Sequence, residues 1–206
     1  MRGPGDVLYN FHWIVPGEAA RAAQAYAGWL GPFLKRHGIR SLINLRGNNP
    51  QFGWWRYESR ICDKLGVAHI DVTLDSRHLP RREMLISLLD AFAAAPRPFV
   101  IKCSGGQDRT SLAAALYLLQ RNGWTALPQA EAHFARFPYL HFPKRHQRWL
   151  RPFLAFAHMS AAGRPIAEWV RTDYEPMLLK NWLEANGLAG SFKAIFEQPV
   201  ASKWQW

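Results

Sequence analysis

Cys103-Ser104-Gly105-Gly106-Gln107-Asp108-Arg109-Thr110 lies between two apolar segments of the chain. The short aliphatic run at residues 99–101 precedes it, and the leucine- and alanine-rich run at residues 112–116 follows it. A short apolar run, two adjacent glycines and a longer apolar run are typical of a strand, a tight loop and a helix in that order. We therefore expect residues 103–110 to join the carboxyl end of a buried strand to the N-terminus of a helix.

A loop of this composition predicts a binding site for an oxyanion. Backbone N–H groups and the positive end of the helix dipole converge on the space in front of a helix N-terminus. Gly105 and Gly106 allow the backbone to approach the anion closely, and Arg109 can hold two of its oxygens with a planar fork. The same field would lower the pKa of the Cys103 thiol below its free value of about 8.5 and leave a nucleophile facing a bound phosphate.

The pattern Cys-x-x-Gly-x-x-Arg-Thr resembles the signature of the cysteine-dependent protein tyrosine and dual-specificity phosphatase superfamily. Cys103, Gly106, Arg109 and Thr110 match it position by position. Lys102 departs from it, because most members carry His there, and support for the thiolate must then come from elsewhere. The Ser-Gly-Gly-Gln-Asp run within the loop is also similar to a variant found in some bacterial lipid-and-protein phosphatases and in the myotubularin inositol-lipid phosphatases.

Two segments before the loop resemble the atypical, Siw-like bacterial branch of this superfamily. Residues 21–24 (RAAQ) are similar to its Arg-Ser-Ala-Gln opening, and residues 43–46 (INLR) are similar to one of its strands. The resemblance covers residues 8–135 and implies a tyrosine-phosphatase-like α/β fold with a short, mainly parallel central sheet flanked by helices. It also implies an enzyme that hydrolyses phosphate monoesters through a cysteinyl-phosphate intermediate. Its implied substrates are phosphotyrosine or dual-specificity protein substrates.

Two other functions stay open. A phospholipid or inositol head-group phosphatase of the same mechanism is favoured by the basic charge, although the loop lacks the lysines of some inositide-specific relatives. A catalytically silent phospho-binding module is disfavoured because both Cys103 and Arg109 are present. The sequence does not choose between a phosphorylated protein and a phospholipid as the substrate.

The resemblance also implies roles for individual residues. Cys103 attacks the phosphorus, and Thr110 donates a hydrogen bond to its sulfur. Asp75, in a polar loop after a predicted strand, is the first choice as general acid; Asp108 is its rival, and Asp71 ranks below both.

Two residues, Gln107 and Gln129, are both open as the residue that orients the water. No metal or cofactor is implied. The phosphoryl oxygens are held by Ser104, Gly105, Gly106, Gln107, Asp108 and Arg109.

Composition predicts one globular domain over residues 1–206, with residues 137–206 as a helical C-terminal extension. The chain is 49% apolar, and its formal net charge of +11 indicates an acidic partner. No nucleic-acid-binding module accompanies that charge, so we expect no nucleic acid.

Cys62 and Cys103 cannot form a disulfide framework, and no run approaches the ~18 apolar residues of a membrane span. We expect a cytoplasmic protein; its oligomeric state is not indicated.

Apolar periodicity and turn residues outline the remaining elements. We expect strands at residues 10–15, 39–45, 67–74 and 99–102, and helices at 26–37, 57–65, 84–92, 110–122, 128–136, 146–159 and 166–186, the last divided at Pro176. Cys62 is expected to be a buried helix residue rather than a resolving thiol, and the tail at residues 204–206 to pack against the domain. A basic stripe is open to contact with an anionic membrane, but a solvated helix face is favoured; it comprises Lys144, Arg145, Arg148 and Arg151, with Phe142 and Trp149.

Overall fold

The computed structural model describes residues 4–26 and 28–197, so the tail at residues 204–206 lies outside the described part. Its centre is a five-stranded sheet in the order β1-β2-β5-β3-β4. Four strands run parallel, and β1 pairs antiparallel with β2 at one edge. The strands are β1 (His12–Val15), β2 (Ala19–Ala22), β3 (Ser41–Asn44), β4 (Ala68–Asp71) and β5 (Phe99–Lys102). This confirms the predicted α/β fold with a short, mainly parallel sheet.

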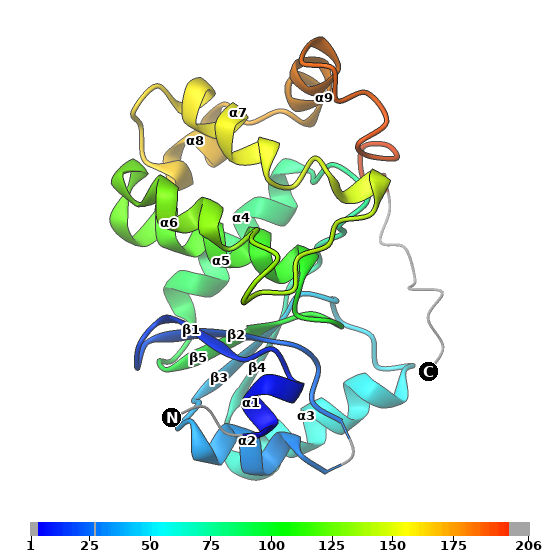
Figure 1. The fold of residues 1–206 in the computed structure, drawn as a ribbon. Helices are drawn as coiled ribbons and strands as arrows, with labels where there is room; N and C mark the ends of the chain where they lie inside the picture. Colours follow the sequence, from blue (N-terminus) through cyan, green and yellow to red (C-terminus); the bar gives the residue numbers. More distant parts are fainter. Residues whose placement is uncertain (1–3, 27, 198–206) are drawn as a thin grey trace.

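Helices cover both faces of the sheet (Figure 1). One face carries α1 (Pro4–Leu8), α2 (Leu30–Arg36) and α3 (Gly53–Leu65). The other carries α4 (Arg82–Ala94), α5 (Asp108–Asn122) and α6 (Leu127–Ala132), with the short turn η1 (Trp124–Ala126) between the last two. A further layer packs outside α4–α6 and consists of η2 (Arg145–Gln147), α7 (Pro152–Ala161), α8 (Ile166–Thr172) and α9 (Pro176–Ala185).

The alternation of side chains along β5 divides the apolar core into two parts. Phe99 and Ile101 pack with α4, α5 and the C-terminal helices, whereas Val100 packs with α2 and α3. Successive side chains of a strand point to opposite faces. Continuing the alternation, Lys102 lies on the α3 side and Cys103 on the α5 side. Lys102, the last residue of β5, and Cys103, the first residue of the loop, therefore lie on opposite faces of the sheet.

Several elements differ from the prediction, and the largest difference, strand β2, has a clear physical cause. Strand β2 was not predicted, because its residues, three alanines and Arg21, carry no strand propensity. It forms because it is inserted between β1 and β5 and its four residues are all buried. The predicted helix at 26–37 starts only at Leu30, and the predicted strand at 67–74 is limited to residues 68–71. Pro176 divides the last helical stretch into α8 and α9, as predicted.

Candidate active site

The loop at residues 103–107 connects the carboxyl end of β5 to the first turn of α5, as predicted. In a parallel sheet this edge is where ligands bind. Neighbouring strands fix the loop at its base, where Leu45 N–H donates to the Lys102 carbonyl (2.9 Å) and Gln24 N–H donates to the Ser104 carbonyl (3.0 Å). The loop is therefore anchored by segments that precede it in the sequence by some sixty to eighty residues.

Gly106 is the most constrained residue of the loop. Its φ is +62°, in the left-handed region, and a Cβ atom at this position would lie 2.6 Å from the Ala23 nitrogen. Its carbonyl oxygen accepts hydrogen bonds from Asn10 Nδ2 (2.9 Å) and Arg21 Nη2 (2.8 Å). The Gly106 N–H also helps to lower the pKa of the Cys103 thiol.

Arg21 supports the loop from inside the protein. It is fully buried, and burial lowers the pKa of its guanidinium to about 10, so the group stays charged at neutral pH. Besides Gly106, the guanidinium contacts Ser111 Oγ (3.0 Å) and His133 Nδ1 (3.0 Å). Burial lowers the pKa of His133 to about 3, so its neutral ring can accept this bond. Arg21 is thus a structural cation whose role the sequence did not indicate.

Cys103 has the environment of a thiolate nucleophile. Its side chain is buried, and desolvation alone would raise the pKa of the thiol. The charge of Arg109, the Thr110 side chain and the N–H groups of Gln107 and Gly106 outweigh desolvation and lower the pKa below its ordinary value. The buried Thr110 hydroxyl has no nitrogen or oxygen partner among the described residues. The predicted loop residues therefore converge on one sulfur atom.

Lys102, which stands where the superfamily pattern has His, is buried behind the loop. Its Nζ donates to Gln24 Oε1 (3.0 Å) and to the Glu58 carboxylate. Burial lowers the pKa of Lys102 to about 8, although Glu58 opposes that shift. Gln24 also accepts a hydrogen bond from Arg46 Nη1 (2.9 Å). Lys102 and Glu58 thus form a buried ion pair behind the loop, and Gln24 connects this pair to Arg46.

The loop opens into a cavity of about 700 Å³. Its lining includes four cationic side chains and two carboxylates, and Arg46 is held on one wall with its guanidinium 3.5 Å above the ring of Trp54. The lining residues are Tyr26, Arg46, Trp54, Thr73, Leu74, Asp75, Ser76, Arg77, His78, Cys103, Ser104, Gly105, Gln107, Asp108, Arg109, Gln147, Lys193 and Phe196. The cavity is therefore larger and more basic than a single phosphate requires.

The C-terminal strap, residues 191–197, completes one wall of this cavity. It runs beside the loop that follows β4, where Lys193 N–H donates to the Arg77 carbonyl (2.8 Å) and Phe196 N–H donates to the Leu79 carbonyl (2.9 Å). Leu79 and Ile195 form a parallel β-bridge. The polar loop after β4 is thus fixed by backbone hydrogen bonds to a segment more than a hundred residues later in the chain.

Asp75 lies in that loop and lines the cavity, but its carboxylate already accepts hydrogen bonds from its own loop. One oxygen, Oδ1, accepts from the Arg77 N–H (2.6 Å), the His78 N–H (3.0 Å) and the His78 ring (3.0 Å). Burial raises the pKa of the Asp75 carboxyl, but these hydrogen bonds and the His78 ring outweigh burial and hold the pKa below its usual range. Asp75 is therefore arranged to stay ionised.

Asp108, the first residue of α5, has the opposite balance. Burial raises the pKa of its carboxyl, and the opposing effects of Arg109, Gln147 and Lys144 do not cancel that shift. Its Oδ2 accepts a hydrogen bond from Gln147 Nε2 (2.9 Å), and Gln147 also donates to Ser76 Oγ (3.0 Å). Gln147 thus links the loop to the opposite wall of the cavity, a contact that the sequence did not indicate.

Other predicted candidates lie elsewhere. Gln129 is exposed on α6 and is not part of the cavity lining, whereas Gln107 is. Cys62 is fully buried in α3, as predicted, and burial raises the pKa of its thiol to about 12. The predicted basic stripe is wrong in one member. Trp149 is completely buried because it packs in the apolar core, and its indole N–H donates to the Ser76 carbonyl (3.0 Å) behind the cavity wall.

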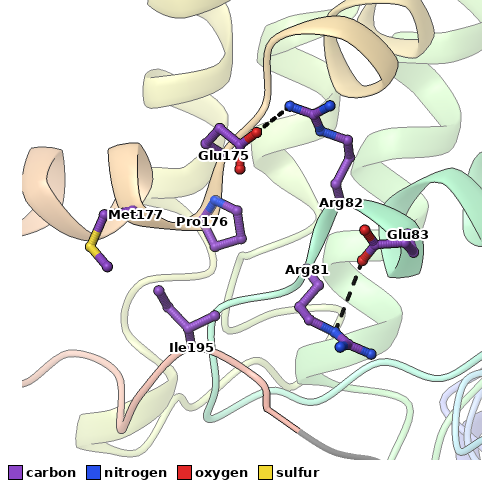
Figure 2. Close-up of a pocket in the computed structure, with 7 residues that line it drawn as sticks. All are labelled: Arg81, Arg82, Glu83, Glu175, Pro176, Met177 and Ile195. Atoms are coloured by element: carbon purple, nitrogen blue, oxygen red, sulfur yellow. Dashed lines mark hydrogen bonds and ion pairs between the residues drawn. The ribbon is translucent and has the colours of Figure 1, made fainter.

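A second, smaller hollow of about 390 Å³ lies where the start of α4 faces the start of α9 (Figure 2). Its charges are paired within the hollow, Arg82 with Glu175 and Arg81 with Glu83. Arg81, Arg82, Glu83, Glu175, Pro176, Met177 and Ile195 line it. This lining offers no nucleophile and no free charge, so we place no chemistry there.

Among residues 4–26 and 28–197, every helix is too short or too polar to cross a lipid bilayer. Over the same residues, His, Cys, Asp and Glu side chains nowhere gather in the groups of three that could hold a metal ion. The candidate chemistry of the described chain is therefore that of the Cys103 loop and its cavity.

No protein-family model and no curated protein matches the chain. Solved structures do match it across most of its length. TpbA of P. aeruginosa is 16% identical, with a TM-score of 0.52 over 89% of this chain and 94% of TpbA; another TpbA structure is a complex with pTyr.

Two further structures have the same fold. The catalytic core of Siw14 is 19% identical, with a TM-score of 0.56 over 87% of this chain and 92% of that one. A second structure of this core describes Siw14 of S. cerevisiae as a PP-IP phosphatase. Tk-PTP is 16% identical, with a TM-score of 0.51 over 70% of this chain and 95% of its own. The chain thus has the fold of cysteine-based tyrosine and dual-specificity phosphatases of the atypical branch, and the predicted resemblance is confirmed at the level of the fold.

Proposed function

We propose that this chain is a cysteine-based phosphatase that hydrolyses phosphate monoesters in two steps. The observation that carries the proposal is the Cys103 thiol, whose pKa is lowered by Arg109 and the loop N–H groups at the floor of an open, basic cavity. A buried structural cysteine would have the opposite shift, as Cys62 does. The two cysteines of one chain thus provide an internal comparison.

In the first step the Cys103 thiolate attacks the phosphorus of the bound ester. The sulfur–phosphorus bond forms as the bond to the leaving oxygen breaks, and that oxygen takes a proton from a carboxylic acid. Arg109 and the loop N–H groups hold the three remaining phosphoryl oxygens. In the second step a water attacks the phosphorus, the electron pair returns to sulfur, and the carboxylate accepts the water's proton. Thr110 stabilises the departing thiolate.

We assign the general acid to Asp108, which reverses the order of preference predicted from the sequence. A general acid must hold a proton at the working pH, and burial raises the pKa of Asp108. Three hydrogen bonds to one oxygen instead keep Asp75 ionised. Asp75 then serves to shape the loop after β4.

Asp108→Asn is expected to lower kcat by about a hundredfold on an alkyl phosphate, whose leaving group needs a proton, and much less on para-nitrophenyl phosphate. It should also remove the fall in kcat at high pH, where Asp108 loses its proton. The matched variant Asp75→Asn should lower kcat equally on both substrates. Steady-state kinetics of both variants from pH 4 to 9 make the comparison. A steeper leaving-group dependence in Asp75→Asn would return the acid role to Asp75.

We propose two candidate substrate classes. Phosphotyrosyl protein is supported by the similarity to TpbA, which has been crystallised with pTyr. A small polyphosphorylated compound, such as an inositol phosphate, is the second candidate. One observation favours it: the cavity includes Arg46, Arg77 and Lys193 in addition to Arg109, and none of these three makes an ion pair with a carboxylate of the described residues.

The test is hydrolysis by the wild-type protein in reducing buffer with a chelator. The panel is para-nitrophenyl phosphate, a phosphotyrosyl peptide and an inositol polyphosphate. We expect turnover of the first in the presence of the chelator, and the higher kcat/KM of the other two identifies the class. Arg77→Gln should raise KM for the polyphosphate about tenfold and leave para-nitrophenyl phosphate unaffected, because only the former carries further phosphates that Arg77 could bind. No turnover of any of the three would refute the phosphatase proposal.

A further inference from the structure

His141 is a buried histidine that the mechanism above leaves without a role. It is 4% exposed and lies in the segment between α6 and η2. Its Nε2 is 3.5 Å from Asp108 Oδ1, and both atoms are buried without a hydrogen-bond partner among the described residues. Leaving two such atoms unpaired would cost free energy. A single proton placed between them would satisfy both.

The position of the proton on the neutral His141 ring is inferred from the surroundings of its other nitrogen, Nδ1. Against the effect of burial, an interaction of the ring with the Phe134 backbone raises the pKa of His141, as expected where a ring N–H donates to a carbonyl. Because Nε2 has no partner, Nδ1 makes this contact and donates its proton to the Phe134 carbonyl. Burial, with a smaller contribution from the charge of Arg21, lowers the pKa of His141 to about 4. At neutral pH the ring is therefore uncharged and presents a lone pair at Nε2.

A lone pair in this position distinguishes the two forms of the Asp108 carboxyl. The acid form can donate Oδ1–H to Nε2, whereas the ionised form would oppose one lone pair with another. The second oxygen, Oδ2, is held by Gln147, whose own amide oxygen accepts the Lys144 N–H (2.9 Å). Gln147 therefore presents its NH₂ group, and the two carboxyl oxygens of Asp108 have different partners.

The charges around this pair come from several elements. Arg109, which follows Asp108 in α5, and Lys144, which precedes η2, both favour the carboxylate. From β2, Arg21 acts on the His141 ring and favours its neutral form. Arg109 and Lys144 thus oppose protonation of Asp108, whereas burial and a hydrogen-bond acceptor at Oδ1 would both favour it. His141 Nε2 is the atom placed to act as that acceptor.

We propose that His141 is a positioning residue that holds Asp108 in its acid form by accepting a hydrogen bond from Asp108 Oδ1–H at Nε2. This inference rests on the proposed function. The Cβ–Cγ torsion of an aspartate is broad and two-fold, so rotation can bring the protonated oxygen to the Oδ2 position. Gln147, which donates at that position, must release its hydrogen bond before the proton passes to the leaving oxygen. After the leaving oxygen has taken it, the carboxylate faces the lone pair of His141 and is a stronger base. It then takes the proton of the attacking water, which restores the resting pair.

His141→Gln tests this arrangement. A glutamine amide can turn its NH₂ group toward the carboxylate, which the neutral histidine with its proton on Nδ1 does not do. We expect the Asp108 carboxyl to titrate about one pH unit lower in the variant, by ¹³C NMR with the signal assigned from Asp108→Asn. The decline of kcat at high pH should move down by the same amount, and turnover of an alkyl phosphate at pH 7.5 should fall about tenfold.

Controls separate this role from a structural one. His158→Gln changes an exposed histidine of α7 and should leave the Asp108 titration unchanged. In an Asp108→Asn background, His141→Gln should have no further effect on alkyl phosphate turnover. An unchanged or higher Asp108 titration, or an equal loss on para-nitrophenyl phosphate that persists in that background, would overturn the inference. If the wild type hydrolyses nothing, the phosphatase proposal fails, and the NMR titration still decides the His141 contact.

Discussion

Cys103→Ser is expected to lower kcat for para-nitrophenyl phosphate by about a thousandfold or more, leaving no covalent intermediate. The hydroxyl of a serine stays protonated at neutral pH, because the ordinary pKa of an alcohol is far higher than that of a thiol. The field that ionises the Cys103 thiol is too weak to ionise an alcohol. Arg109 and the loop N–H groups remain, so the variant should still bind inorganic phosphate. Steady-state kinetics and a phosphate-binding titration measure the two effects separately.

The matched control for this change is Cys62→Ser. Cys62 is fully buried in α3, and burial raises the pKa of its thiol to about 12. The substitution should reduce thermal stability and leave kcat of the folded protein unchanged. Iodoacetate should likewise inactivate the wild type by alkylating Cys103 alone, and inorganic phosphate should protect it. Full activity of Cys103→Ser would refute the thiolate mechanism.

Gly106→Ala is expected to have the second largest effect, a loss in kcat of about a hundredfold. A methyl group at this position would lie 2.6 Å from the Ala23 nitrogen, and the positive φ of +62° strains any residue with a side chain. Strand β2 is fixed between β1 and β5, so the loop must move instead, and its N–H groups would no longer converge on the Cys103 sulfur. We also expect the free energy of unfolding to fall by about 1–3 kcal/mol.

Gly105→Ala is the control for the loop itself. An added methyl at Gly105 would meet only the Gln107 side chain, at 3.7 Å, which is an ordinary contact. This variant should keep kcat within a few-fold of wild type and the same urea unfolding midpoint. Equal losses in the two alanine variants would mean that loop flexibility, rather than the approach of Gly106 to β2, is what the glycines provide.

The site could be predicted as far as it is contiguous in the sequence. Cys103, Arg109 and Thr110 belong to one loop, whose flanking strand and helix have clear apolar patterns. The supports of that loop come from distant segments and have no local signal. Arg21 is an arginine among alanines, and only the sheet order reveals that it is buried beneath Gly106. A charged residue in an alanine run is more readily interpreted as part of a helix surface.

The choice between the two carboxylates likewise needed the folded structure. Asp75 lies in the loop after β4 and Asp108 is the first residue of α5. The resemblance favoured Asp75, because it follows a predicted strand in a polar loop where the acid of the superfamily would lie. What separates them is hydrogen bonding, because three donors converge on Asp75 Oδ1 whereas Asp108 Oδ1 has none. Trp149 shows the same limit, since its position within a basic segment suggested exposure although the fold buries it behind the cavity wall.

The strap at residues 191–197 has a consequence for how the protein is made. All five strands and the Cys103 loop are encoded before residue 108, and chains begin to fold from the N-terminus during synthesis. The wall that contains Lys193 and Phe196 cannot form until the strap has left the ribosome. The phosphate-binding loop of a nascent chain is therefore synthesised about eighty residues before the strap that completes the cavity wall.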